Sequence, residues 1–131
     1  MAERAIQRQY ILDAGALIAH ERRDPKVAAL MEVAAAHRIE MVLPSTVLAQ
    51  VWRDGRRQAL LARALRNPGI IEAPLDHDDA RQAGELLRAS GTADVVDAHV
   101  VVLARRLEAP VITSDPGDMA RLNTSIALIR V

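Results

Sequence analysis

Residues 94–118 read DVVDAHVVVLARRLEAPVITSDPGD, and this stretch decides the fold class of the chain. Its first half has the apolar spacing of a buried helix face, and its middle, PVIT, has the composition of a core strand. Carboxylates this close to apolar surface are costly unless a cation neutralises them. Four aspartates nevertheless punctuate the stretch: Asp94, Asp97, Asp115 and Asp118. The stretch therefore indicates a helix followed by a buried strand, with an acidic site beside them.

Outward from this stretch, apolar runs that read as strands alternate with amphipathic stretches that read as helices. The expected strands are residues 10–12, 41–44, 70–75, 110–114 and 125–131. Strands that alternate with helices at this spacing are typical of an α/β fold with a mainly parallel sheet. Because crossovers between parallel strands are right-handed, we expect a three-layer α/β/α sandwich with about five strands.

Polar residues in front of the apolar patterns predict where several helices begin. Ser45 or Thr46 is expected to cap a helix that Gly55 closes. Thr92 is expected to cap the helix that carries the first two aspartates of the decisive stretch. Asp118 is expected to cap a brief helix before the last strand.

Length and composition predict one aliphatic domain. The 131 residues suit a single domain over 1–131, long enough to bury a core. Half of the residues are hydrophobic, but the aromatic ones are only Tyr10 and Trp52. Formal net charge is zero, which argues against a broadly cationic nucleic-acid coat. Trp52, among apolar neighbours, is expected in the core or an interface.

Absent residue types exclude several chemistries. The chain has no cysteine, so disulfides, zinc thiolates and thiol nucleophiles are excluded. Its single lysine, Lys26, leaves little room for a catalytic lysine. No apolar run approaches the ~20 residues that a bilayer requires, and the N-terminus does not read as a signal peptide. We therefore expect a cytoplasmic protein with no membrane partner.

The aspartates are expected to converge at one edge of the sheet. Asp13 directly follows the first strand and Asp115 follows the fourth, so both point to the carboxyl edge, where α/β folds bind ligands. The helix with Asp94 and Asp97 must run antiparallel to the strands, which brings its N-terminus to that edge. Each acid alone could be ordinary turn or helix-end chemistry. Together they indicate a Mg²⁺ or Mn²⁺ site, because hard cations prefer oxygen ligands.

At this point the chain resembles PIN domains, and specifically the VapC-type toxins of bacterial type II toxin–antitoxin pairs. The resemblance covers essentially the whole chain and rests on ILDAGALIA, VLPSTVLAQVWR, DVVDAHVVVLA and VITSDPGDMARL. It implies a PIN-like sandwich whose acidic residues hold Mg²⁺ or Mn²⁺. The positions that match the family's acidic residues are Asp13, Gln50, Asp97 and Asp115, with Asp94 and Asp118 as nearby extra acids.

The resemblance implies a metal-dependent endoribonuclease, a hydrolase that cuts phosphodiester bonds in RNA. It further implies a cognate VapB-type antitoxin and a homodimer. The carboxylates would hold the metal, and Asp94 would be a ligand or would orient a water molecule. Thr113 and Ser114 could steer a phosphate or a metal-bound water molecule, although Ser or Thr at a strand end more often reflects simple turn chemistry. Arg53, Arg56 and Arg57 could hold the RNA backbone, or could simply form a solvated helix face.

Two positions depart from the family pattern. Gln50 stands where the family usually carries Glu, and it keeps an oxygen ligand but loses a negative charge. Gly15 stands where many members carry a hydroxyl residue, and it offers no side-chain ligand. The alternative reading is therefore a weakened or inactive PIN-like module that binds RNA or a partner protein.

Overall fold

The computed structural model describes residues 8–117, 122 and 125–131, and in this part of the chain five strands form one parallel sheet. The order across the sheet is β3-β2-β1-β4-β5. The strands are β1 (Gln9–Leu12), β2 (Glu40–Pro44), β3 (Ile70–Ala73), β4 (Val111–Thr113) and β5 (Leu128–Arg130). The expected α/β class with a five-stranded, mainly parallel sheet is confirmed.

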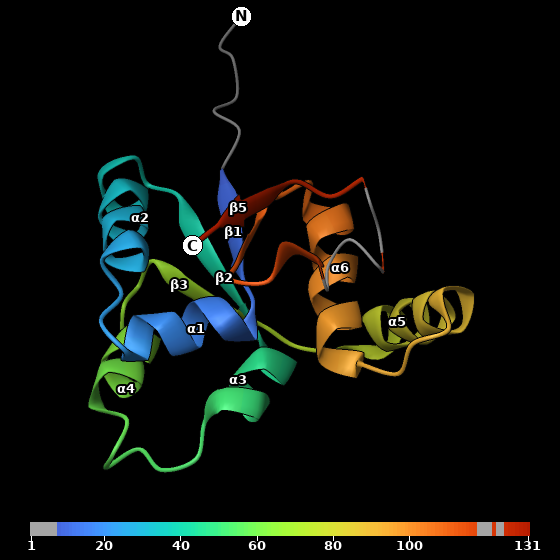
Figure 1. Ribbon diagram of the computed structural model, residues 1–131, viewed down its shortest axis with the longest axis horizontal. Helices are drawn as coiled ribbons and strands as arrows, with labels where there is room; N and C mark the ends of the chain where they lie inside the picture. The colour runs from blue at the N-terminus through green and yellow to red at the C-terminus, as the bar shows by residue number, and fades with distance from the viewer. Residues whose placement is uncertain (1–7, 118–121, 123–124) are drawn as a thin grey trace, which may run out of the picture.

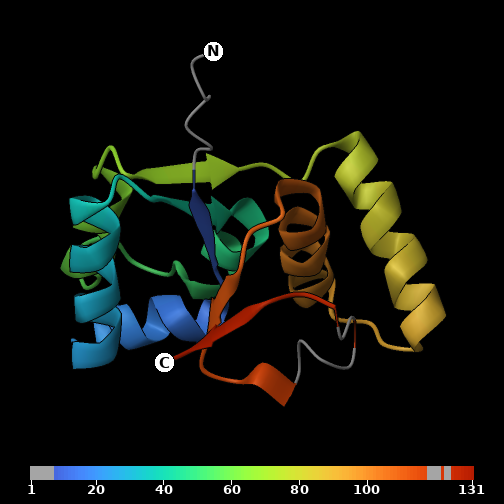
Figure 2. The same ribbon diagram turned by 90° about the horizontal axis from the view of Figure 1, so that it is seen from above.

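Helices cover both faces of this sheet, which gives the expected three layers (Figures 1 and 2). The helices are α1 (Ala14–Glu21), α2 (Pro25–Ala36), α3 (Ser45–Val51), α4 (Ala59–Leu65), α5 (His77–Ser90) and α6 (Val95–Leu107). Helices α1 and α2 lie on one face, while α6 lies on the other with α5 packed outside it (Figure 2). Helix α3 lies near the carboxyl edge of the sheet, where it contacts both α1 and α6 (Figure 1).

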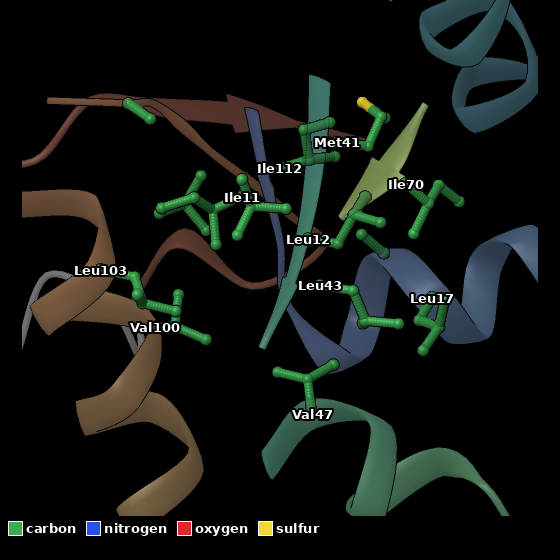
Figure 3. Close-up of a cluster of buried hydrophobic side chains, with 14 of the residues drawn as sticks. Ile11, Leu12, Leu17, Met41, Leu43, Val47, Ile70, Val100, Leu103 and Ile112 are labelled. Carbon is green, nitrogen blue, oxygen red and sulfur yellow. The ribbon is translucent and has the colours of Figure 1, made fainter. Parts of the chain in front are cut away.

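The core is aliphatic, and it occupies both sides of the central strands. Successive side chains of a strand point to opposite faces. Ile11 and Leu12 are both buried, because helices cover each face of β1. Figure 3 shows Val100 and Leu103 of α6 on one side of the sheet and Leu17 of α1 on the other. Trp52, partly buried, packs against this core as the sequence suggested.

The start of α6 differs from the prediction. Asp94, not Thr92, is the N-cap, since its carboxylate accepts a hydrogen bond from the backbone N–H of Asp97 at 3.0 Å. Both residue types are good caps. The predicted choice was wrong by two residues, and the error matters because the cap is itself one of the candidate site residues. The predicted cap Asp118 lies outside the described residues.

Helix α3 also differs at both ends from its prediction. It follows Pro44 without a side-chain cap, and Ser45 Oγ instead accepts the N–H of Leu75 at 3.1 Å. The helix ends at Val51 and not near Gly55. The Gln58 side chain explains the early end, because its Oε1 accepts the N–H groups of the residues 53 and 54 that follow the helix, at 2.7 and 3.0 Å.

An ion pair between a buried aspartate and a half-exposed arginine links α5 to α6. Asp79 is 3% exposed at its side chain, and its Oδ2 accepts a hydrogen bond from Nη2 of Arg106 at 2.9 Å, whose side chain is 48% exposed. Ala83 of α5 packs beside it against Ala98 and Val102 of α6. The pair is therefore buried on one side and open to water on the other, so screening limits its strength.

We expect Arg106→Leu to lower the free energy of unfolding by about 1–3 kcal/mol, because it leaves the Asp79 carboxylate buried without its cation. The double variant Asp79→Asn/Arg106→Leu should recover most of the loss. Urea unfolding followed by circular dichroism measures both values. Arg105→Leu, an exposed neighbour on the same helix, is the matched control. Equal losses in the single and double variants would contradict the role of the pair.

Candidate active site

Pairing of β1 with β4 brings two aspartates together from opposite ends of the chain. Leu12 and Ile112 are partners in the parallel register, so the residues that follow them emerge side by side at the carboxyl edge. Asp13 comes directly after β1, and its backbone N–H donates to the Ile112 carbonyl at 3.2 Å. Asp115 comes two residues after β4. The sheet register therefore places both carboxylates at one edge, as the sequence predicted.

Asp13 is a buried carboxylate held in place by the start of α1. It is 6% exposed and is the N-cap of α1, where Oδ1 accepts the N–H of Ala16 at 2.8 Å. Burial raises the pKa of Asp13 above its usual value, and the negative charge of Asp115 adds to the rise. Hydrogen bonds from the Thr113 hydroxyl and from the Ala16 and Gly15 backbone oppose that rise.

Thr113 connects the two aspartates from below the surface. It has no exposed surface, so it does not itself face a substrate. Its Oγ1 accepts the backbone N–H of Asp115 at 3.0 Å, while its hydroxyl donates to the Asp13 carboxylate. The residue thus fixes the direction in which the chain leaves β4. Its neighbour Ser114 is exposed and lines the pocket described next.

The acidic residues meet at a pocket of about 230 Å³. Asp94, the N-cap of α6, and Asp97, in the first turn of that helix, reach the pocket, and Gln50 reaches it from α3. The lining residues are Asp13, Ala14, Gly15, Gln50, Asp94, Asp97, Ser114 and Asp115. The four carboxylates and the glutamine that sequence reasoning singled out, Asp118 excepted, therefore lie around one cavity.

The donor set of this pocket suits a hard divalent cation, although it does not form a preassembled cage. Within residues 8–117, 122 and 125–131, no three His, Asp or Glu side chains are arranged to hold a metal ion. The available ligands are carboxylate and amide oxygens, which Mg²⁺ and Mn²⁺ prefer. Asp94 and Asp115 are exposed. The Asp115 carboxylate can rotate toward a cation without disturbing the core, and Asp94 can offer the carboxylate oxygen that does not cap α6. A cation would also offset the repulsion between Asp13 and Asp115.

A buried hydrogen bond joins the helices that carry Gln50 and Asp97. His99 of α6 has no exposed surface, and its Nδ1 lies 2.7 Å from Thr46 Oγ1 of α3. Burial lowers the pKa of His99 below its usual value, although the negative charge of Asp79 partly opposes this, so the ring is neutral at pH 7. Sequence reasoning missed the contact, because the two residues are 53 positions apart and share no local pattern.

The arginine side chains that follow α3 differ in how many contacts they make within the protein. Arg53 is committed to the end of that helix, since its Nη1 donates to the carbonyls of Ala49 and Trp52 at 3.0 and 2.7 Å. Arg56 and Arg57 are exposed on the connection to α4. The Arg57 Nε lies 3.8 Å from Asp54 Oδ2, a loose surface pair. Arg56 and Arg57 are therefore better placed than Arg53 to hold an external anion.

Comparison with known proteins agrees with the geometry. Residues 10–123 match the PIN domain. The chain belongs to the PIN domain family. No curated protein matches the sequence. Among the residues that the structure describes, no helix is long and apolar enough to cross a membrane.

Solved structures similar to this PIN domain come from toxin–antitoxin systems. VapBC2 of Rickettsia felis, bound to a promoter DNA fragment, has a TM-score of 0.73 at 18% identity, covering 94% of this chain and 98% of that one. VapC20 of Mycobacterium tuberculosis, a sarcin-ricin loop cleaving toxin, has a TM-score of 0.69 at 20% identity, and the match covers 93% of this chain and 99% of that one. A toxin–antitoxin complex from Klebsiella pneumoniae has a TM-score of 0.70 at 14% identity, and the match covers 92% of this chain and 95% of that one. At these identities the likeness shows the fold.

We expect Asp13→Asn to melt at a higher temperature than the wild type at pH 7 without metal. Burial raises the pKa of Asp13, so its ionisation opposes folding, and stability is lost as the pH rises through that pKa. The amide keeps the oxygen that accepts the Ala16 N–H. The advantage should vanish as the pH falls through the raised pKa.

Thermal melts in EDTA across the acid range measure the difference. Asp94→Asn is the matched control, because Asp94 is also an N-cap but is exposed, and its change should alter the melting temperature little. An Asp13→Asn variant less stable than the wild type at pH 7 would contradict the expectation.

Proposed function

We propose that this PIN-domain protein is a toxin-type endoribonuclease that depends on Mg²⁺ or Mn²⁺, with residues 1–131 acting as one domain. The observation that supports this proposal is the pocket at the carboxyl edge of the sheet. It gathers the carboxylates of Asp13, Asp94, Asp97 and Asp115 with the amide of Gln50. Carboxylates gathered in this way could hold a divalent cation beside the phosphodiester of a bound RNA.

Asp13, Asp97 and Asp115 would hold the metal in this scheme. A divalent ion held there would lower the pKa of a water molecule that it binds and would offset the negative charge that develops on the phosphate. Asp94 would act as a further ligand or would orient water. Its Oδ1 caps α6, so its other carboxylate oxygen would do this work. Thr113 would act as a positioning residue that keeps Asp13 and Asp115 apart at a constant distance.

Arg56 and Arg57 would bind the RNA backbone, because exposed guanidinium groups neutralise phosphates without reading sequence. Arg53 would contribute less, since its guanidinium also serves the end of α3. The description of the Mycobacterium tuberculosis neighbour as a sarcin-ricin loop cleaving toxin supports RNA as the substrate class. Similar folds in toxin–antitoxin complexes support a VapB-type antitoxin as a partner. A homodimer and a cytoplasmic location complete the proposal.

The test is incubation of the pure protein with total RNA and Mn²⁺ or Mg²⁺, with new 5′ ends mapped by sequencing. We expect discrete ends that disappear in EDTA. Asp97→Asn should lower the cleavage rate by about 100-fold, which corresponds to a loss of about 2.7 kcal/mol in transition-state stabilisation. Asp78→Asn, an exposed aspartate on α5 outside the pocket, is the matched control and should cleave normally. Ends that persist in EDTA or in Asp97→Asn would refute the proposed site.

A second candidate function is a PIN module that binds RNA or a protein without cutting. Two observations favour it: Gln50 lines the pocket where the family pattern has Glu, and the described carboxylates form no preassembled metal cage. Under this reading the missing negative charge leaves the metal too weakly held for catalysis.

Gln50→Glu distinguishes the two candidates. We expect it to raise Mn²⁺ affinity roughly tenfold, because one added charge near a cation is worth on the order of 1 kcal/mol or more. Calorimetric titration of Mn²⁺ measures the affinity, and the RNA assay measures the rate. Gln82→Glu, the same change at an exposed site on α5, is the matched control. Cleavage by Gln50→Glu alone would favour the binding module, whereas cleavage by the wild type would favour the nuclease.

A further inference from the structure

Gly15 of α1 and Ser114 after β4 lie against each other in the wall of the acidic pocket. A Cβ atom added at Gly15 would fall on Ser114 Oγ, with Ser114 Cβ at 3.2 Å and Asp13 Oδ1 at 3.5 Å. A side chain at position 15 would therefore require the exposed Ser114 side chain to rotate, so that its hydroxyl would leave its present place in the pocket. The Ser114 hydroxyl fills the space that a side chain at position 15 would need.

The backbone does not explain why position 15 is glycine. Gly15 lies within α1, and Gly91 is the one described glycine with a positive φ. Glycine in the interior of a helix costs about 0.5–1 kcal/mol relative to alanine, and Gly15, in the first turn of α1, has a smaller cost of the same kind. An alanine at position 15 would place its Cβ where Ser114 Oγ now lies, so it would displace that hydroxyl. The glycine thus has a local cost, and its visible consequence is a hydroxyl group in the pocket.

The Ser114 hydroxyl can donate a hydrogen bond, a property that it shares only with Gln50 among the described side chains of the pocket. Ionised carboxylates only accept hydrogen bonds. Thr113 has already committed its hydroxyl to the two aspartates. Ser114 is exposed, and its hydroxyl makes no hydrogen bond with any other described residue. It is therefore available to a ligand.

We propose that Ser114 Oγ donates a hydrogen bond to a non-bridging oxygen of the scissile phosphate, and that Gly15 is present to admit this hydroxyl. This inference rests on the proposed nuclease function and adds a substrate-contacting residue to it. A phosphate that enters the pocket presents anionic oxygens to a wall of carboxylates, and it needs donors as well as cations. Ser114 directly precedes Asp115 and lines the same pocket as Asp13, so it supplies such a donor among the carboxylates.

The experiment compares variants of the full chain on the RNA that the wild type cleaves. We expect Ser114→Ala to lower kcat/KM by about 10- to 100-fold, the loss for a hydrogen bond to a charged group. Ser114→Thr, which keeps the hydroxyl, should stay within a fewfold of wild type. Gly15→Ala should lower activity like Ser114→Ala, because its methyl group displaces Oγ. Gly84→Ala is the matched control, since a Cβ there meets nothing within 4 Å.

Hydroxyl transfer separates this role from simple packing. In Gly15→Ala/Ser114→Gly the clash is relieved, and thermal stability should recover while activity stays low. In Gly15→Ser/Ser114→Gly the hydroxyl returns from the other side of the same gap, and activity should rise at least about fivefold above the alanine–glycine pair, the direction expected when a donor is restored. Full activity in Ser114→Ala, or no gain on transfer, would overturn the proposal while leaving the nuclease function intact.

A binding measurement covers the case in which the wild type cleaves no RNA. Absence of cleavage by the wild type would contradict the proposed function. The Ser114 contact would then be tested by the affinity of the protein for random-sequence 2′-O-methyl RNA in Mg²⁺. Binding by Ser114→Ala at least about fivefold weaker than by the wild type would support the contact to phosphate. Equal affinity would overturn it.

Discussion

Parallel pairing between β1 and β4 is the constraint on which the acidic pocket depends. Leu12 and Ile112 are partners in that pairing although they are 100 positions apart in the chain. Their register delivers Asp13 and the turn after Thr113 to the same edge of the sheet. Helix α6 precedes β4 and must run back along the sheet, so the same pairing also brings Asp97 to that edge. The chemistry of the pocket therefore follows from backbone hydrogen bonds made one layer below it.

The pocket conflicts with the stability of the fold that carries it. Asp13 is nearly buried, and burial together with the charge of Asp115 raises its pKa. Hydrogen bonds from Thr113 and from the start of α1 reduce that conflict without removing it. Places where a fold accepts such a cost are often functional, because an isolated structural role would be filled more cheaply by a neutral residue. A bound cation would offset this electrostatic cost.

Two helices outside this strand pair adjust the pocket. The buried contact between His99 and Thr46 ties α6 to α3, and Gln50 lies one turn beyond Thr46 on α3. The pair of Asp79 and Arg106 holds α5 against the far side of α6. Helix α6 is thus fixed from both sides, which limits how far Asp97 can move relative to the sheet. Positioning of this kind matters because small displacements of reacting groups have large effects on rate.

Apolar periodicity was enough to predict the α/β class, the parallel sheet and the edge at which Asp13, Asp97 and Asp115 meet. These features follow from local patterns, since a strand end and a helix start can be read from a few adjacent residues. The N-cap of α6 and the end of α3 were misjudged. Thr92 and Asp94 have equal local claims, and the Gln58 side chain that accepts the N–H groups of residues 53 and 54 is itself bonded to Glu21, 37 positions away. Only the tertiary structure decided these choices.

Gly15 shows the same limit most clearly. In the sequence, Gly15 stands where the family pattern often has a hydroxyl residue. In the fold, the absence of a side chain at Gly15 leaves room for the Ser114 hydroxyl. The sequence by itself determined which residue types were available and which elements would carry them. The tertiary structure alone decided which of them touch, because contacts between residues about 100 positions apart depend on strand register and helix packing, and no local pattern encodes either.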